Sequence, residues 1–322
     1  MIDFHTHIFP PNFPNYNKKF NTNIYIYLEG FQNQTWMMYK GNKFRKIKDN
    51  CLYLEDRLKD MNKMGIDKQV LSCVPIMFSY DAPVEEAKEI VTFINDFLSD
   101  SVSQYPEKFM ALGTLPMQDI ETCLQVIEEN NNFIGYQIGS NINNINLDHE
   151  KFYPLYKKIC DKDLILFIHP WNMMGQENMS EYWLPWLVGM PAETSRAICS
   201  MIFGGIFDKF PNLKVVFAHG GGSFCGTLGR IEHGYNVRPD LCAKKCELTP
   251  KSYCGKFYVD SLVHSKEDLN KIVNLLGEDN VILGTDYPFP LGDLEPDKSL
   301  EESGLSEIIK TKIKKDNLLK II

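Results

Sequence analysis

Residues 164–169 read LILFIH, five apolar residues followed by a histidine. Two later stretches have the same form: KVVFAH at 214–219 ends in His219, and VILGTD at 281–286 ends in Asp286. A buried parallel strand appears in a sequence as a short, near-continuous apolar run. Each stretch therefore predicts a strand with a titratable group at its carboxyl end.

Runs of this kind recur along the whole chain, and helical segments separate them. We expect strands at residues 2–7, 69–74, 109–114, 134–138, 164–169, 214–219, 256–260 and 281–286, and helices at 55–64, 84–103, 120–130, 153–160, 192–210, 222–233 and 266–276. Strands that alternate with helices form a parallel sheet. Eight such strands favour an α/β fold of the (β/α)8 TIM-barrel type over an open doubly wound sheet, because no glycine-rich phosphate turn follows the first strand.

One segment, residues 10–50, interrupts the alternation after the first strand. Within it, residues 24–27 and 44–47 suggest short strands. Loops that follow barrel strands emerge at one end of the barrel, so we expect this small insertion to lie over the barrel mouth. We find no internal repeat and no low-complexity linker, and we expect a single domain over residues 1–322.

Charge and cysteine content limit the partners and the compartment. The chain has 34 basic and 42 acidic residues, a net charge of -8, and this field would repel a polyanion. We therefore expect no nucleic-acid partner and no membrane partner, whereas a small acidic substrate fits a locally cationic pocket. Nine cysteines without a CxxC pair are typical of reduced thiols, and no uncharged apolar run approaches about 18 residues. We expect a cytoplasmic protein.

Five titratable groups mark the ends of four expected strands. His5 and His7 are separated by one residue, so their side chains share one face of the first strand, and His169, His219 and Asp286 end three later strands. In a barrel these ends converge on one cavity. A lone histidine is usually a packed core residue, but four at equivalent positions are not explained in that way. Three imidazoles and one carboxylate suit zinc or another divalent ion, and the fifth group suits an acid/base beside it.

Several motifs around these residues resemble a known family. HTH at 5–7, HP at 169–170, HGGG at 219–222 and GTDYPFP at 284–290 resemble the nonoxidative decarboxylase branch of the amidohydrolase superfamily. The longer motifs MPAET at 190–194 and VILGTDYPFPLGDLEP at 281–296 resemble the family of α-amino-β-carboxymuconate-ε-semialdehyde decarboxylases of tryptophan catabolism. The similarity runs from residue 2 to about residue 295 and includes the insertion.

The resemblance implies a zinc-dependent carboxy-lyase that forms α-aminomuconate semialdehyde in the kynurenine pathway and thereby limits quinolinate formation. It implies one zinc ion per subunit of a homodimer, with His5, His7, His169 and Asp286 as ligands, and His219 as the acid/base that activates the metal-bound water. Two arginines would hold the substrate carboxylates: Arg45, and Arg230 from the neighbouring subunit. It places further pocket positions on Phe44, Met173, Trp186, Phe289, Leu291 and a basic residue, Lys40.

Other readings stay open on the residues alone. The same strand-end ligands would serve hydrolysis of an amide or lactone, and a noncatalytic metal-binding protein would also carry them. Arg45 and Arg230 could be surface charges. Trp183 and Trp186 are three residues apart, so on a helix they would share a face and pack in a core or interface. Three histidines lie at no strand end, and we expect them to bind no metal: His149, His233 and His264.

Overall fold

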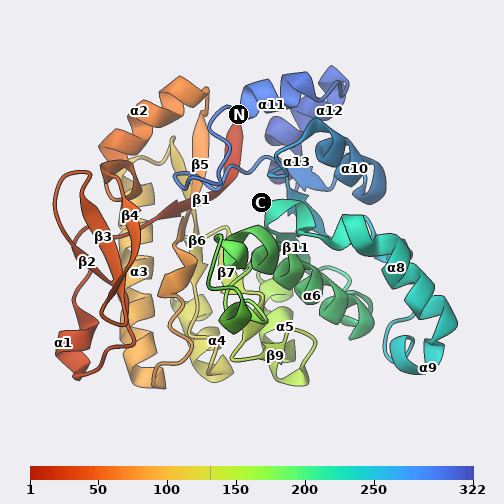
Figure 1. Ribbon diagram of the computed structural model, residues 1–322, viewed down its shortest axis with the longest axis horizontal. Coiled ribbons are helices and arrows are strands. Elements are labelled where there is room, and N and C mark those ends of the chain that lie inside the picture. Colours follow the sequence, from red (N-terminus) through yellow and green to blue (C-terminus); the bar gives the residue numbers. More distant parts are fainter. Residues whose placement is uncertain (131) are drawn as a thin grey trace.

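Eight parallel strands form a barrel in the computed structural model, which describes residues 1–130 and 132–322 (Figure 1). Around the barrel the strands follow the order β1 (Ile2–Ile8), β5 (Lys68–Cys73), β6 (Phe109–Thr114), β7 (Gly135–Gly139), β10 (Ile165–His169), β11 (Lys214–Phe217), β12 (Tyr258–Asp260) and β13 (Val281–Ile282). The N–H of Phe4 donates to the carbonyl of Leu283, and the N–H of Asp286 donates to the carbonyl of His5, both at 2.8 Å. These bonds join the first strand to the chain after the last, and the expected (β/α)8 fold is confirmed.

Helices surround the strands and cover the outside of the barrel (Figure 1). They are α1 (Tyr16–Phe20), α2 (Leu54–Met64), α3 (Val84–Gln104), α4 (Ile120–Glu129), α5 (Tyr153–Asp161), α6 (Met190–Phe203), α7 (Ile206–Lys209), α8 (Phe224–Val237), α9 (Pro239–Cys242), α10 (Lys266–Leu276), α11 (Pro296–Glu302), α12 (Glu307–Thr311) and α13 (Asn317–Leu319). Side-chain caps fix four of the starts, those of α1, α4, α10 and α12. For example, Asp119 accepts the N–H of Thr122 before α4, and Ser265 accepts that of Asp268 before α10. Among the described residues, no helix combines the length and the apolar character needed to cross a membrane.

Two hydrophobic layers hold the barrel together. Successive side chains of a strand point to opposite faces, so in β10 Phe167 packs inside the barrel while Leu166 and Ile168 pack under the helices. In β1 the pairing with β5 shifts between Asp3 and Thr6, as in a β-bulge. Phe4 and His5 therefore both reach Phe167, with ring centroids 5.1 and 4.9 Å away.

The insertion after β1 contains an antiparallel sheet of β2 (Tyr27–Glu29), β3 (Thr35–Tyr39) and β4 (Asn42–Ile47), beside α3 in Figure 1. Its last strand agrees with the expected one. The expected strand at 24–27 is wrong, because Tyr25 and Ile26 are buried in the core and the strand begins only at Tyr27. A further short hairpin, β8 (Asn141–Ile142) and β9 (Ile145–Asn146), follows β7.

Glycines change two of the expected helices. The helix expected at 192–210 is two helices, α6 and α7, because Gly205 has a φ of 70° and a Cβ there would lie 2.5 Å from the carbonyl oxygen of Lys245. The helix expected from residue 222 begins at Phe224. Residues 220–222 have φ values of 60°, 77° and 61° and form the turn that separates β11 from α8.

Candidate metal centre

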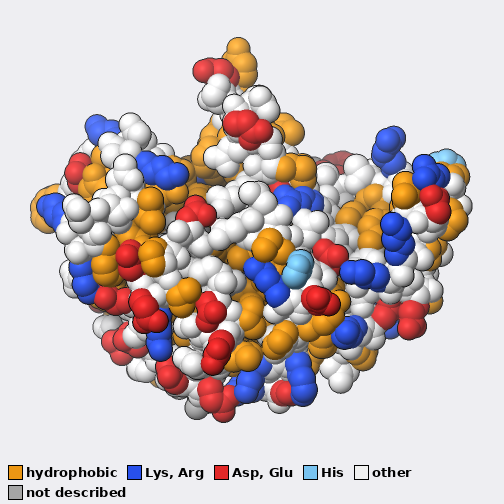
Figure 2. Space-filling view, turned by 90° about the horizontal axis from the view of Figure 1, so that it is seen from below, with side chains coloured by type: hydrophobic (Ala, Val, Ile, Leu, Met, Phe, Trp, Pro, Cys, Tyr) orange, Lys and Arg blue, Asp and Glu red, His pale blue; other side chains and the backbone are white. Residues whose placement is uncertain are grey.

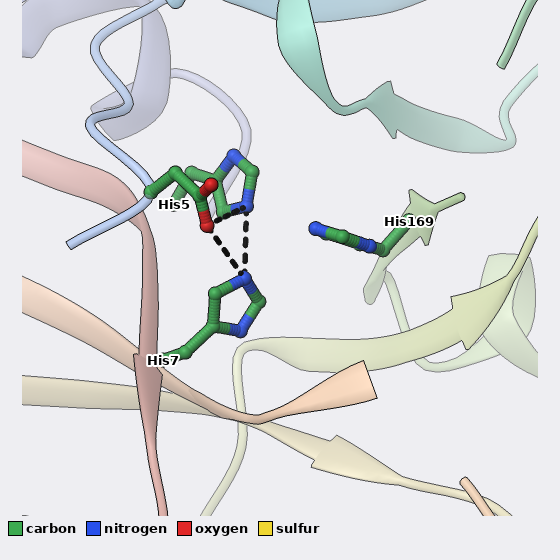
Figure 3. A group of neighbouring side chains, drawn as sticks. His5, His7 and His169 are labelled. Carbon is green, nitrogen blue, oxygen red and sulfur yellow. Dashed lines mark hydrogen bonds and ion pairs between the residues drawn. The ribbon is translucent and has the colours of Figure 1, made fainter. Parts of the chain in front are cut away.

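Four side chains from three parts of the barrel meet at its carboxyl end. His5 and His7 come from β1, His169 is the last residue of β10, and Asp286 follows β13. All four are buried, and their ligand atoms lie within 4.8 Å of one another. Nε2 of His7 is 3.1 Å from Nε2 of His5 and 3.1 Å from Oδ1 of Asp286. Figure 3 shows the rings of His5, His7 and His169 pointing toward one centre.

The hydrogen bonds of the three rings suit a divalent cation at this centre. The outer nitrogen of each ring faces an oxygen: Nδ1 of His5 faces Asp260 (2.6 Å), that of His7 the carbonyl of Cys73 (3.0 Å), and that of His169 the carbonyl of Pro170 (3.0 Å). Each Nδ1 can thus carry the proton, which leaves each Nε2 free to bind a metal.

A second observation concerns His169 alone. Its Nε2 is buried and meets no hydrogen-bond partner among the described residues. A buried polar atom in this state costs about 1–3 kcal/mol. Three imidazoles and one carboxylate are also a donor set that zinc and related divalent ions accept. The residues present therefore fit a metal ion.

Burial and neighbouring charges set the protonation of this cluster. Burial lowers the pKa of His7 to about 4 and that of His169 well below its ordinary value. Burial alone would raise the pKa of Asp286, but the imidazoles of His219, His7 and His5 around it hold that pKa well below its usual range. Near neutral pH, His7 and His169 are uncharged and Asp286 is ionised, as metal ligands must be. For His5 the effect of burial is outweighed by the hydrogen bond and charge of Asp260, which raise its pKa, so a metal ion that binds there displaces a proton.

His219 lies beside the cluster and faces the cavity. It follows β11 at the start of the HGGG turn, with a φ of 57°, and its Nε2 is 3.8 Å from Oδ2 of Asp286. Its ring centroid is 5.0 Å from that of His169. The His219 side chain is 17% exposed, against 0% for His5 and 1% for His7. It can therefore exchange protons with a molecule in the cavity.

A cavity of about 380 Å³ opens over the cluster. Arg45 of β4 lines it, and its guanidinium lies 4.6 Å from the ring centroid of Phe289, 5.5 Å from that of Trp186 and 5.6 Å from that of Phe44. Contacts of this kind between a cation and aromatic rings are attractive. The cavity thus combines a metal-ligand cluster, a cation and apolar walls, and this arrangement can orient a small anion against the cluster.

The structure separates the other expected pocket residues into two groups. Five line the cavity: Phe44, Arg45, Trp186, Phe289 and Leu291. Three do not line the cavity of their own chain. Met173 is buried against Gly189, Lys40 is exposed at the turn between β3 and β4, and Arg230 is exposed on α8. Trp183 and Trp186 do not share a helix as expected. Trp183 precedes the helical segment Pro185–Gly189 and has a φ of 60°, and both tryptophans line the cavity.

Two residues near the centre were missed from the sequence. Asp260 is buried and contacts His5 directly, and it ends the expected strand at 256–260, the position that singled out His169. The position at a strand end therefore marks Asp260 as it marks His169. His264, which we set aside because it ends no strand, lines the cavity with Lys271. No pattern in the sequence distinguishes His264 and Lys271 from surface residues.

Comparisons with known proteins agree with this geometry. The chain matches the family described as Amidohydrolase over residues 2–320. It is 49% identical to the 2-amino-3-carboxymuconate-6-semialdehyde decarboxylase of Dictyostelium discoideum, over 99% of this chain and 89% of the relative. It is 37% identical to the protein of the same name from Caenorhabditis elegans, over 94% of this chain and 88% of the relative.

A solved structure extends the comparison to the fold. It is the 5-carboxyvanillate decarboxylase of Novosphingobium aromaticivorans complexed with manganese and 4-hydroxy-3-methoxy-5-nitrobenzoic acid, with a TM-score of 0.76 and 27% identity. The match covers 84% of this chain and 81% of that one. The chain belongs to the amidohydrolase family, within its group of 2-amino-3-carboxymuconate-6-semialdehyde decarboxylases.

Proposed function

We propose that this protein is a zinc-dependent carboxy-lyase that converts 2-amino-3-carboxymuconate-6-semialdehyde to α-aminomuconate semialdehyde and CO2 in tryptophan catabolism. One observation carries the proposal: the buried cluster of three histidines and one aspartate opens into a cavity that also holds Arg45. The relatives named above support the choice of substrate. The nine free cysteines support a reducing, cytoplasmic location.

In this proposal, His5, His7, His169 and Asp286 hold one zinc ion per subunit. A bound divalent cation lowers the pKa of a coordinated water toward about 7 and polarises oxygen atoms of a substrate. The mixed nitrogen and oxygen donor set supports zinc, whereas a solved relative is complexed with manganese. Metal analysis of the protein as purified distinguishes the two ions.

The chain's own residues supply binding and proton transfer. Overall, the bond between carbon and the departing carboxylate breaks, and a carbon–hydrogen bond replaces it. His219, beside the cluster, takes a proton from water and returns it to the substrate carbon, and the hydroxide that is left takes up a proton from the solvent, so that one proton is consumed for each CO2 released. Arg45 binds a substrate carboxylate with two parallel hydrogen bonds and holds the group to be lost out of the π plane. The rings around Arg45 keep water from its faces.

The second carboxylate requires a second cation, and we propose Arg230 of the partner subunit in a homodimer. Arg45 is the single arginine that lines the cavity among the described residues, and Lys271 is the other cation with a fixed positive charge in the lining. We favour an arginine for the second carboxylate because its planar fork matches a carboxylate with two hydrogen bonds. Arg230 lies on the exposed side of α8. The arm formed by α8 and α9 also exposes Val237 (55%) and Leu241 (54%), and Leu248 (45%) is exposed in the segment that follows α9. In Figure 2 this arm is the lobe at the right-hand edge, where hydrophobic side chains lie among Lys and Arg. Apolar surface of this kind favours contact with another copy.

Two assays on one preparation test the reaction class. We expect CO2 release and loss of the substrate absorbance with 2-amino-3-carboxymuconate-6-semialdehyde, and no acid release from a lactone of a dicarboxylic acid. The opposite result would show a hydrolase, since the same barrel ligands serve both reactions. His219→Ala protein provides the control for spontaneous decay of the semialdehyde.

A further inference from the structure

Asp260, the last residue of β12, accepts four hydrogen bonds while completely buried. Its Oδ2 accepts from Nδ1 of His5 (2.6 Å) and from the backbone N–H of His219 (2.8 Å). Its Oδ1 accepts from the backbone N–H of Gly220 (2.8 Å) and of Leu262 (3.1 Å). One carboxylate thus contacts a residue of the metal cluster and the turn that carries the acid/base.

We propose that Asp260 is a positioning residue that fixes the ring of His5 for metal binding and the turn of His219 for proton transfer, through the two oxygens of one carboxylate. The inference rests on the metal site proposed above and goes beyond it, because Asp260 touches neither the cavity nor its contents. The role has two parts, which act on different neighbours of the same side chain.

The first part concerns the tautomer of His5. A neutral imidazole carries one proton, on Nδ1 or on Nε2. An ionised carboxylate only accepts, so Asp260 keeps the proton on Nδ1 and leaves Nε2 free to face His7 and Asp286. Carboxylates that contact a metal-binding histidine in this way change metal affinity by about 10- to 100-fold when they are removed.

The second part concerns the backbone of the HGGG turn. His219 and Gly220 both have left-handed conformations, with φ values of 57° and 60°. A residue with a Cβ adopts this conformation at a cost and keeps it only where its surroundings fix it. The N–H groups of both residues point at Asp260, one at each oxygen. The carboxylate therefore holds the turn in the conformation that places the His219 ring beside Asp286.

Asp260→Asn changes this arrangement with almost no change in size. Each oxygen of Asp260 accepts from at least one backbone N–H, so either orientation of the new amide directs its NH2 group at a backbone donor. If that group replaces Oδ2, it also faces Nδ1 of His5 and favours the tautomer with the proton on Nε2, which cannot bind a metal. At Oδ1 the NH2 group would face two backbone donors, whereas at Oδ2 it faces only the N–H of His219, because the His5 ring can change its tautomer. The orientation that impairs metal binding is therefore the favoured one.

The matched control is Asp119→Asn. Asp119 lies at the start of α4, is outside the cavity lining, and accepts the N–H of Thr122, a capping role that asparagine also performs. Competition with a chromophoric chelator measures Zn2+ binding to each protein without any substrate. We expect Asp260→Asn to bind Zn2+ about 10- to 100-fold more weakly than wild type, and Asp119→Asn to bind as wild type does. Folded Asp260→Asn protein with wild-type Zn2+ affinity would overturn the proposal.

A measurement on the unmodified protein keeps the test decisive if Asp260→Asn does not fold. In metal-free protein with 15N-labelled histidine, held at a pH above the raised pKa of His5 so that its ring is neutral, NMR identifies which nitrogen of His5 carries the proton, with His5→Gln used to assign the signal. We expect the proton on Nδ1, and a proton on Nε2 would overturn the proposal. Failure of the decarboxylase assay leaves this result unaffected, so the two hypotheses fail separately.

Discussion

His219 and the four cluster residues differ in what their removal should do. His219 lies beside the cluster and lines the cavity, whereas the Nε2 atoms of the other three imidazoles face the centre. We therefore expect His219→Ala to lower kcat about 100-fold or more, since it removes the general acid/base. We expect the metal content to remain at the wild-type value.

Steady-state kinetics together with metal analysis check this prediction. His149→Ala serves as the control, because the exposed His149 lies outside the cavity. His219→Ala protein that keeps wild-type turnover would show that the acid/base lies elsewhere. Loss of the metal together with the activity would instead make His219 a ligand.

Acid should destabilise the metal-free protein partly through His7. Burial lowers the pKa of His7 from 6.5 to about 4, so between these pH values the unfolded chain binds more protons than the folded chain. The contribution of uncharged His7 to the free energy of unfolding is therefore complete above pH 6.5, and it is lost as the pH falls toward 4. Urea unfolding of metal-free wild type and His7→Asn should show wild type losing more stability over this range. If the free energies of unfolding of wild type and His7→Asn differed by the same amount at every pH, the lowered pKa would not belong to His7.

At the scale of single residues, all four residues of the cluster could be named from the sequence, because strand ends in a barrel converge on one cavity. The sequence could not separate the pocket residues in the same way. Met173 and Lys40 lie in irregular or turn segments, where the direction of a side chain depends on contacts that no periodic pattern encodes. Asp260 ends its strand as His169 does, but a strand-end position does not reveal that its partners are His5 and the backbone of the HGGG turn.

The HGGG turn connects a strand to a helix, and one of its glycines is required on steric grounds. Gly222 has a φ of 61°, and a Cβ there would lie 2.3 Å from the carbonyl oxygen of Pro191 at the start of α6. We expect Gly222→Ala to destabilise the protein by about 1–3 kcal/mol, through backbone strain and the displacement of α6 or the turn. Since His219 begins this turn, kcat should fall as well.

Gly234→Ala is the matched control within α8. A Cβ at Gly234 meets no described atom within 4 Å, and alanine favours a helix interior over glycine by about 0.5–1 kcal/mol. The midpoints of thermal and urea unfolding should therefore be lower than those of wild type for Gly222→Ala and higher for Gly234→Ala. Equal stability of Gly222→Ala and wild type would mean that the turn adapts without cost.

Among the helices and strands, the sequence predicted best those whose ends are set by residues within the element or next to it. The bounds of α10 and β6 agree with the expected 266–276 and 109–114, and for α10 the cap at Ser265 provides the cause. Strand β3 was missed because its pairing with β2 and β4 is not encoded in its own residues. The break between α6 and α7 depends on a contact of Gly205 with a segment 40 residues away, at Lys245.

For the whole molecule, the proposed dimer predicts recovery of activity on mixing. Arg45→Ala and Arg230→Ala should each be inactive or weak, because loss of one charged hydrogen-bonding partner costs about 1.5–3 kcal/mol of substrate binding. In a hybrid dimer one site would keep its own Arg45 and receive intact Arg230 of the partner subunit. Activity after subunit exchange should therefore exceed that of either parent. No recovery, with exchange proven by native mass spectrometry, would contradict a shared site.

The most direct test of the central claim measures the metal and the activity of the same protein in three states: as purified, stripped with a chelator, and reloaded with Zn2+. The gathering of His5, His7, His169 and Asp286 predicts one divalent ion per chain, loss of decarboxylation on stripping, and its return on reloading. Stripped protein that consumes 2-amino-3-carboxymuconate-6-semialdehyde at the original rate would contradict the account.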